Sequence, residues 1–338
     1  MKELVNLAFI GDVMLGRGVN EEIPWRSPDD FWGNVLPILQ KADAVIANLE
    51  CAITEHPQQW SKTPKAFYFR ADPAAVDVLR AGNIRFVSLA NNHTLDFEEQ
   101  GLLDTLHYLD AAGIHHAGAG RNIKEATTPA VINVGGFKVG IIAITDNEPE
   151  FAATSDRPGT NYLPIRSDSK TLALIESWIV QLRRSGAGLV IVSAHWGPNM
   201  VTSPPPHFRR FAHAVIDCGV DIFHGHSAHL FQGIENYKYG LILYDTGDFL
   251  DDYAVDPLLR NDWSFVFLVE VDSKGLRRLR LIPVRLRYAR VDLAKGDEFE
   301  AICKRMQFLC AAFNTVCVLK SPEGLEVKLR DDRKVTEE

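Results

Sequence analysis

Short apolar runs of strand length alternate with helix-like segments through most of this 338-residue chain. Residues 7–11 (LAFIG), 44–48 (AVIAN) and 86–90 (FVSLA) are rich in residue types that favour strands. Each run is followed by a segment with the apolar spacing of a helix, and these segments are 35–42, 73–82 and 98–113. Such alternation favours a layered α/β architecture. We expect two sheets packed together and flanked by helices, although the periodicity alone also allows a single doubly wound sheet.

The second half of the chain continues this pattern and then becomes β-rich. Two strand-like runs surround Gly135 and Gly136, which predicts a hairpin. The other expected elements are a helix over 171–186, a strand over 189–196, helices over 208–219 and 299–313, and hairpins between these last two helices.

The chain contains no repeat, low-complexity tract or linker-like segment that would mark a domain boundary. Its hydrophobic content of 46% and charged content of 24% are typical of a folded protein. We predict one domain over residues 1–338, with the chemical motifs in 4–250 and a β-rich plus helical part in 251–330.

Composition and charge exclude several classes of protein. A net charge of −8 argues against a nucleic-acid partner, which would require clustered cations. The arginine-rich stretch 277–287 alternates with apolar residues and predicts the solvated face of a β meander. No segment resembles a signal peptide or the roughly 20 apolar residues of a membrane anchor. Cys303 and Cys310 fall on an apolar helix face as core residues, so a cytoplasmic location is expected, whereas the oligomeric state is not indicated.

Polar residues that can bind metals stand at the ends of the apolar runs. Because strand ends meet at the edge of a sheet, residues from distant segments can converge there on one hydrolytic metal site. The residues in question are Asp12, Asn48, Glu50, Asn92, His93, His195, His224, His226 and His229.

These residue types suit a site with one or two divalent ions, with Mn, Fe or Zn favoured by the mixed oxygen and nitrogen donors. The residues expected to serve as ligands are Asp12, Glu50, Asn92, His195, His226 and His229, with His224 as a further candidate. His93 is expected to donate a proton to a leaving group, and Asp96 to orient its imidazole.

Each residue also has a purely structural explanation when it is taken alone. Asp12 suits a turn or a helix cap, Glu50 a solvated strand end, and Asn92 a strand-to-helix turn. His195 suits a buried core histidine. The segment 224–229 (HGHSAH) is harder to explain structurally, since three imidazoles so close together repel one another on protonation unless they bind something.

The motifs GDVMLGR, ANLE, SLANNHTLDF, AHWG, HGHSAH, QGIE and LYDTGDFL resemble those of the CapA proteins of poly-γ-glutamate capsule synthesis. These proteins are a branch of the calcineurin-like metallophosphoesterases. The resemblance implies a four-layer α-β-β-α sandwich with a dinuclear metal site. By its pattern Asn92 is a metal ligand, His93 the catalytic histidine, and His226 with His229 the final ligand pair.

The chain departs from the phosphoesterase pattern at three places. Met14 stands where the first motif has a histidine, so one metal position is expected to be weak or vacant. Glu50 replaces the usual bridging aspartate. The GHxxH spacing leaves open whether His224 or His226 is the ligand.

An anionic substrate, small or polymeric, is expected to contact Arg17, Lys65 and Arg70, although residues 63–70 also read as a surface loop held by its aromatics. The leading hypothesis is a metal-dependent hydrolase acting on a phosphate ester or a related anion. The alternatives are a metal-free acid/base enzyme acting on an activated carbon or acyl centre, and a non-catalytic protein that binds an anionic polymer such as poly-γ-glutamate.

Overall fold

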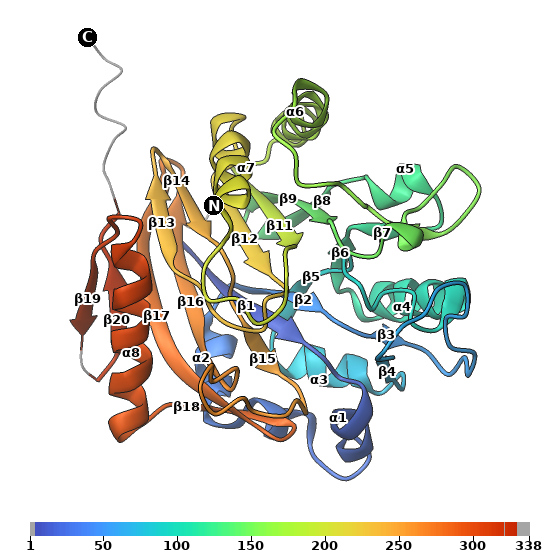
Figure 1. The fold of residues 1–338 in the computed structure, drawn as a ribbon, viewed down its shortest axis with the longest axis horizontal. Helices are drawn as coiled ribbons and strands as arrows, with labels where there is room; N and C mark the ends of the chain where they lie inside the picture. The colour runs from blue at the N-terminus through green and yellow to red at the C-terminus, as the bar shows by residue number, and fades with distance from the viewer. Residues whose placement is uncertain (1–3, 321, 330–338) are drawn as a thin grey trace.

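The larger of two main sheets is built around β1 (Val5–Val13). The computed structural model describes residues 4–320 and 322–329 (Figure 1). The other strands of this sheet are β2 (Ala44–Leu49), β5 (Ile84–Ser88), β6 (His115–Ala117), β15 (Asp248–Leu250), β16 (Trp263–Asp272), β17 (Gly275–Arg287), β18 (Arg290–Leu293), β19 (Cys317–Lys320) and β20 (Gly324–Val327). Their order is β19-β20-β17-β16-β1-β2-β5-β6, with β15 beside β1 and β18 beside β17.

The second main sheet has six strands and a parallel centre. Its strands are β8 (Ala130–Val134), β9 (Phe137–Thr145), β11 (Leu189–His195), β12 (Ile222–His226), β13 (Ile234–Tyr237) and β14 (Gly240–Leu243), in the order β13-β14-β12-β11-β9-β8. Two small sheets pair β3 (Ala52–Ile53) with β4 (Arg70–Ala71), and β7 (Ala119–Gly120) with β10 (Gly159–Thr160).

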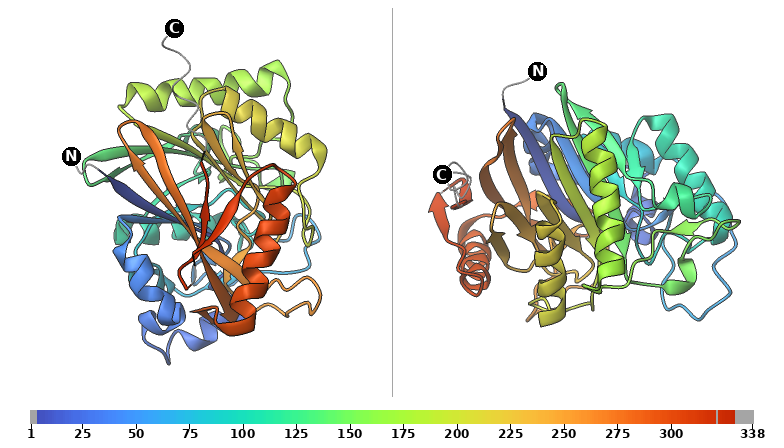
Figure 2. Two further views of the ribbon diagram at one scale, coloured as in Figure 1. Left: turned by 90° about the vertical axis from the view of Figure 1, so that its left-hand side faces the viewer. Right: turned by 90° about the horizontal axis from the view of Figure 1, so that it is seen from above.

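Helices cover the outer faces of both sheets (Figure 2). They are α1 (Arg17–Glu22), η1 (Pro28–Val35), α2 (Leu36–Lys41), α3 (Ala75–Ala81), α4 (Glu98–Ala112), α5 (Ile123–Ala126), η2 (Pro149–Phe151), α6 (Ser169–Arg184) and α7 (Pro206–Asp217). A further helix, α8 (Gly296–Ala311), instead packs its buried face against the core between the sheets. In the left panel of Figure 2, α6 and α7 lie above the sheets and the blue helices of the N-terminal region lie below them. Among the described residues, no helix is long and apolar enough to cross a membrane.

Three apolar clusters separate these layers. Because side chains alternate along a strand, Leu7 and Phe9 point into the core between the sheets, while Ala8 and Ile10 pack against the outer helices. A third cluster lies between the six-stranded sheet and the helices α6 and α7. The predicted four-layer α-β-β-α sandwich is therefore confirmed, and the single doubly wound sheet is excluded.

The arginine-rich stretch is strand β17, as the meander prediction required. Leu279 and Leu281 point into the core between the sheets. Arg278 and Arg280 alternate with them and lie within ion-pair distance of Glu326 and Glu270, respectively. Most of the positive charge of this stretch is thus matched by carboxylates on neighbouring strands.

Strand register places the predicted site at one edge of both sheets. Asp12 on β1 is in parallel register with Asn48 on β2 and with Asp248 on β15. His195 on β11 is in register with His226 on β12. All of these residues lie at or near the carboxyl ends of parallel strands, except that Asp248 begins β15.

The close approach of β15 to β1 requires a glycine. A Cβ atom on Gly11 would lie only 1.6 Å from the carbonyl oxygen of Gly247. The amide of Asp12 donates a hydrogen bond to that same carbonyl at 2.9 Å. Gly11 thus lets the chain before Asp248 run directly beside Asp12.

Candidate metal centre

Asp12 is the central residue of the site and lies between the two sheets. Its side chain is 1% exposed. Its Oδ1 accepts a hydrogen bond from Asn48 Nδ2 at 2.8 Å, and its Oδ2 accepts one from the backbone amide of Ser227 at 3.2 Å. These bonds fix the carboxylate so that each oxygen faces a different group of imidazoles and carboxylates.

The first of these groups is formed by Asp12, His195 and His226. One donor atom from each residue lies within 4.8 Å of the others. The Nδ1 atoms of His195 and His226 are 3.1 Å apart, and His226 Nδ1 is 3.6 Å from Asp12 Oδ1. Two imidazoles and one carboxylate at this spacing are a suitable ligand set for a borderline divalent ion.

The second group shares Asp12 and adds Glu50, His229 and Asp248. Its donor atoms also lie within 4.8 Å of one another. His229 Nδ1 is 2.7 Å from Asp248 Oδ1 and 3.9 Å from Asp12 Oδ2. Three carboxylates and one imidazole make this position richer in oxygen than the first.

Unpartnered oxygens show that this cluster fits a cation. Glu50 Oε1, Asn92 Oδ1 and Asp248 Oδ2 are buried and accept no hydrogen bond from the described residues. Buried oxygens in this state are costly unless something else satisfies them. A divalent ion among these carboxylates would supply both the missing contacts and the missing positive charge.

The electrostatics of the carboxylates lead to the same conclusion. Burial raises the pKa of Asp12 to about 7, against the attraction of the His229 imidazole. Burial, together with repulsion from Asp12, raises the pKa of Glu50 well above its usual range. These carboxylates therefore hold protons tightly in the metal-free protein, and a bound cation would displace them.

The imidazoles divide into two types. Burial holds the pKa of His195 and that of His226 well below the usual range, so both rings are neutral at neutral pH and able to bind a metal. Burial alone would lower the pKa of His229, but the carboxylates of Asp248, Glu50 and Asp12 together raise it well above that range.

His93 and Asp96 form a separate pair at the side of the cluster. His93 Nδ1 is 2.6 Å from Asp96 Oδ2, and His93 Nε2 is 3.8 Å from Glu50 Oε1. The imidazole stacks on Phe69, with ring centroids 3.9 Å apart. The structure thus brings together the two residues predicted to act in proton transfer, with one ring nitrogen directed at the cluster.

The asparagines near this pair differ in their roles. Asn91 donates hydrogen bonds to Asn48 Oδ1 and to the carbonyl of Leu49, and its own oxygen accepts one from the amide of His93. Asn91 therefore holds the loop together. Asn92, the predicted ligand, has the unpartnered Oδ1.

His224, the further candidate ligand, lies outside both groups, and so does Met14, which stands at the histidine position of the first motif. His224 places Nε2 3.1 Å from Thr246 Oγ1 and packs edge-on against Phe9. Met14 is fully buried, and its sulfur accepts a hydrogen bond from the amide of Gly16 at 3.1 Å. The prediction missed Asp248, although it lies in the quoted motif LYDTGDFL.

A pocket of about 630 Å³ opens directly over the cluster. It is lined by His93, Asn92 and His229 together with aromatic, amide and cationic side chains; these include Arg17, Lys65, Phe67, Phe69, Asn199 and Tyr253. Arg17, Glu148, Met200 and His229 line it in left-handed backbone conformations, at φ 52°, 49°, 56° and 57°. Strained backbone of this kind is concentrated at functional sites.

The three residues predicted to contact substrate differ in their position and exposure. The Arg17 guanidinium is 40% exposed and lies over the rings of Phe69 and Tyr253 in the pocket. Lys65 lines the pocket, but its side chain is only 6% exposed. Arg70 is not among the lining residues; it donates to the carbonyl of His56 and lies over Phe97.

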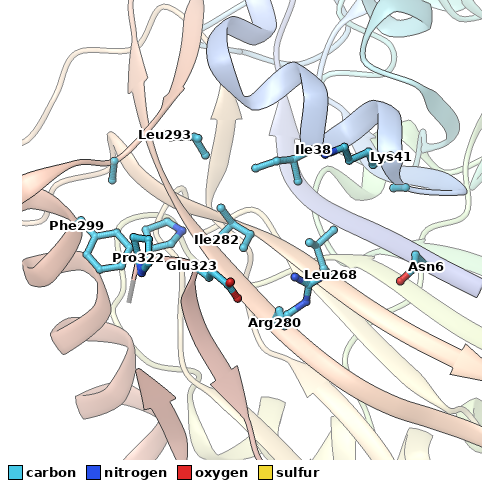
Figure 3. Close-up of a pocket in the computed structure, with 13 residues that line it drawn as sticks. Asn6, Ile38, Lys41, Leu268, Arg280, Ile282, Leu293, Phe299, Pro322 and Glu323 are labelled. Carbon is cyan, nitrogen blue, oxygen red and sulfur yellow. The ribbon is translucent and has the colours of Figure 1, made fainter. Parts of the chain in front are cut away.

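A second hollow, of about 520 Å³, lies on the outer face of the larger sheet (Figure 3). It is lined mainly by apolar side chains such as Ile38, Ile282 and Phe299. Asn6, at the opposite end of β1 from Asp12, also lines it. None of the metal-binding candidates contributes to this hollow, so the chemistry of the site belongs to the pocket above Asp12.

The fold and the candidate site together define a class of α/β proteins. Its members are four-layer α-β-β-α sandwiches that bring carboxylates and imidazoles from both sheets to one edge, where they have the residues for a dinuclear metal centre. Within that class, the chain belongs to the family described as bacterial capsule synthesis protein PGA_cap, whose model matches residues 6–253. This confirms the CapA resemblance.

Curated relatives agree with this assignment. The chain is 31% identical to the probable polyglutamine synthesis accessory protein of Mycobacterium tuberculosis, covering 96% of both chains. It is 30% identical to the capsule biosynthesis protein CapA of Bacillus anthracis, covering 84% of this chain and 68% of the relative.

Solved structures with a similar overall shape are more distant. One is a 5'-nucleotidase from Candida albicans, with a TM-score of 0.46 and 12% identity over 80% of this chain and 48% of that one. Another is the sulfate thiohydrolase SoxB from Thermus thermophilus, with a TM-score of 0.44 and 10% identity over 90% of this chain and 60% of that one.

Proposed function

We propose that this protein is a metal-dependent hydrolase of an anionic substrate, with phosphate esters as the leading class. The observation that carries the proposal is the pair of ligand groups that share Asp12 and leave Glu50 Oε1 and Asp248 Oδ2 unpartnered. His93 beside this cluster adds a group able to transfer a proton.

The residues that would hold two divalent ions follow from the geometry. Asp12, His195 and His226 suit one position, and Asp12, Glu50, His229 and Asp248 suit the other, with Asn92 Oδ1 also available. When bound by these residues, divalent ions would supply activation of a water near neutral pH and stabilisation of the negative charge that develops on the substrate.

The protein's own side chains complete the mechanism. Asp96 accepts a hydrogen bond from the Nδ1–H group of His93, which directs Nε2 at the reacting centre. Burial and the charge of Lys65 hold the pKa of His93 well below its usual range, so Nε2 gives a proton to the departing group only after the ring has taken up a second proton from water. The Arg17 guanidinium is placed to bind the anionic part of the substrate. The rings of Phe69 and Tyr253 contact each other and line the pocket beside His93.

A second candidate function is recognition of an anionic polymer. The relatives are named for polyglutamine synthesis and for capsule biosynthesis. The half-open pocket with the exposed cation Arg17 also suits a carboxylate-bearing chain such as poly-γ-glutamate. In this function the protein would bind the polymer, or hydrolyse a γ-glutamyl amide, rather than cleave a phosphate ester.

The test combines metal content with turnover. We would purify the protein without chelator, measure metals by elemental analysis, and assay p-nitrophenyl phosphate, bis(p-nitrophenyl) phosphate and a γ-glutamyl anilide. The variants are Glu50→Ala and His229→Ala, with His107→Ala, an exposed residue of α4, as the control.

Each outcome has a defined meaning. About two equivalents of Mn, Fe or Zn in the wild type and in His107→Ala, with loss of metal and turnover in the other variants, supports the dinuclear hydrolase. Turnover that survives complete removal of metal contradicts it. Binding of poly-γ-glutamate without any turnover would favour the second candidate.

A further inference from the structure

Lys65 is a buried cation at the floor of the candidate active-site pocket. It lies in the loop between β3 and β4, and its side chain is 6% exposed. Its Nζ donates a hydrogen bond to the carbonyl oxygen of Asn92 at 2.5 Å and is 3.2 Å from Asp96 Oδ1. It is also 3.9 Å from Glu148 Oε1 and lies over the ring of Phe151.

These contacts distinguish Lys65 from Arg17, the other cation that lines the pocket. Arg17 is 40% exposed, and its Nε lies 3.3 Å from Asp252 Oδ2, so the two terminal nitrogens of its guanidinium remain for a ligand. Lys65, in contrast, donates one hydrogen bond to the Asn92 carbonyl and lies within ion-pair distance of the Asp96 and Glu148 carboxylates, so its charge is matched within the protein. Withdrawing it to bind a substrate would leave the buried Asp96 carboxylate without its nearest cation.

Asp96 needs such a cation because it is fully buried. Burial raises the pKa of Asp96 to about 8, while the charge of Lys65 and the amide of Phe69 oppose the rise. Asp96 Oδ2 accepts from the amide of Phe69 at 2.6 Å and lies 2.6 Å from His93 Nδ1. Lys65 lies against the other oxygen and opposes this rise, and a charged Asp96 can only accept a hydrogen bond from the Nδ1–H group of His93.

The same ammonium also fixes the backbone next to His93. Its hydrogen bond to the Asn92 carbonyl joins the loop of residues 54–69 to the loop that carries Asn92 and His93. The Phe69 ring, from the same lysine-bearing loop, stacks on the His93 imidazole. Lys65 and Phe69 thus restrain His93 from two directions.

We propose that Lys65 is a positioning residue that acts through Asp96 and the Asn92 carbonyl to hold His93 with its Nε2 directed at the reacting centre. It is not a substrate-binding cation. This inference rests on the proposed hydrolytic function for its catalytic consequence, but the arrangement of Lys65, Asp96 and His93 can be tested without any substrate.

The experiment uses the full-length chain labelled with ¹⁵N-histidine. The variants are Lys65→Met, Asp96→Asn and the double substitution. Lys62→Met is the matched control, because Lys62 lies in the same loop but is 46% exposed and pairs with Glu99 at the surface. NMR detects the His93 Nδ1 proton in the short bond to Asp96 as a downfield resonance, assigned by its loss in His93→Gln.

We expect that resonance in the wild type and in Lys62→Met, and its loss or broadening in Lys65→Met. With bis(p-nitrophenyl) phosphate as the probe, kcat of Lys65→Met should fall roughly 10²-fold with little change in KM. Lys65→Met should have little further effect on kcat when Asp96 is already asparagine, since both substitutions remove the same interaction.

Three results would overturn the proposal. They are an unchanged downfield resonance in Lys65→Met, its absence from the wild type, and a raised KM with unchanged kcat, which would identify a substrate-binding cation. If the wild type hydrolyses none of the tested substrates, the proposed function fails, and the NMR comparison alone decides the role of Lys65.

Discussion

Asp12 and Asp248 stand side by side on the parallel strands β1 and β15, and the charge of Asp248 contributes to the raised pKa of Asp12. Two carboxylates in a buried position repel each other unless a cation lies between them. Asp248 belongs to the second ligand group, whereas Met14 belongs to neither. Met14 replaces the histidine of the first motif, and this replacement predicts a weak metal position. In the structure, the carboxylate of Asp248 is available as a ligand in its place.

Asp248→Asn should lower the metal content of the protein from about two equivalents to about one. The remaining ion is expected at the position formed by Asp12, His195 and His226. Elemental analysis after dialysis measures this change. Met14→Leu is the control, since it replaces a buried apolar side chain of similar volume and should leave the metal content unchanged. Equal metal loss in both variants would exclude Asp248 as the compensating ligand.

His93→Gln should lower kcat by roughly 10²- to 10⁴-fold, because it removes the group that protonates the leaving oxygen. His93 lies outside both ligand groups, so the metal content should remain that of the wild type. Steady-state kinetics on p-nitrophenyl phosphate, paired with elemental analysis, checks both statements. A substrate with a better leaving group should recover part of the lost rate, and failure to do so would argue against an acid role.

Arg17→Met should affect binding more than chemistry. Loss of one charge-assisted contact of about 2 kcal/mol corresponds to a roughly 30-fold increase in KM. We expect kcat to change little. Arg26→Met is a suitable comparison, because Arg26 pairs with Glu22 on the neighbouring helix and does not line the pocket. An unchanged KM in Arg17→Met would remove Arg17 from the substrate site.

His224 should make the metal-free protein sensitive to acid. Burial lowers the pKa of His224 to about 3, so the folded protein keeps this ring neutral while the unfolded chain protonates it near pH 6.5. The unfolded state then binds the extra proton, and stability falls as the pH drops from about 6.5 towards 3. At pH 5 this amounts to about 2 kcal/mol.

Urea denaturation at pH 7.5 and pH 5, with chelator present, measures that effect. The free energy of unfolding of His224→Gln should fall by about 2 kcal/mol less than that of the wild type over this interval. The comparison concerns the pH dependence, so a general loss of stability in the variant does not affect it. Equal pH dependence in both proteins would refute the assignment.

Gly11→Ala should destabilise the fold by about 3 kcal/mol and disturb metal binding. The added methyl group would collide with the backbone of Gly247, which cannot move without displacing Asp248. Gly140→Ala on β9 is the control, because its added methyl group meets the terminal atoms of the flexible Leu182 side chain. Thermal unfolding and metal content should show a clearly larger loss for Gly11→Ala.

The alternation of strands and helices and most of the strand ends could be predicted from local periodicity, whereas the four-layer sandwich was implied by the resemblance to the CapA proteins. Which of His224 and His226 is the ligand could not be predicted from sequence, since both side chains point to the same side of β12. Successive residues on one face of a strand are about 6.6 Å apart, so only the last of them reaches the edge where Asp12 lies.

The positions of Asp248 and Lys65 depend on contacts between distant segments. β15 is a strand of three residues, too short to show a period, and its pairing with β1 depends on Gly11. The loop that carries Lys65 is predicted from sequence to present a cation to substrate. In the structure the Lys65 side chain lines the pocket but is only 6% exposed, and Phe69 of the same loop stacks on His93. Residues 330–338, at the end of the predicted single domain, lie outside the described part of the chain.

The two sheets contribute different ligands to the first candidate ion: Asp12 comes from one sheet, and His195 and His226 from the other. An ion bound by all three would be a cross-link between the layers, comparable to a disulfide that joins two distant segments. Sliding of one sheet over the other would then change the coordination geometry directly. The packing of the core between the sheets therefore sets the dimensions of the metal centre, and a substitution deep in that core can alter catalysis without touching a single ligand.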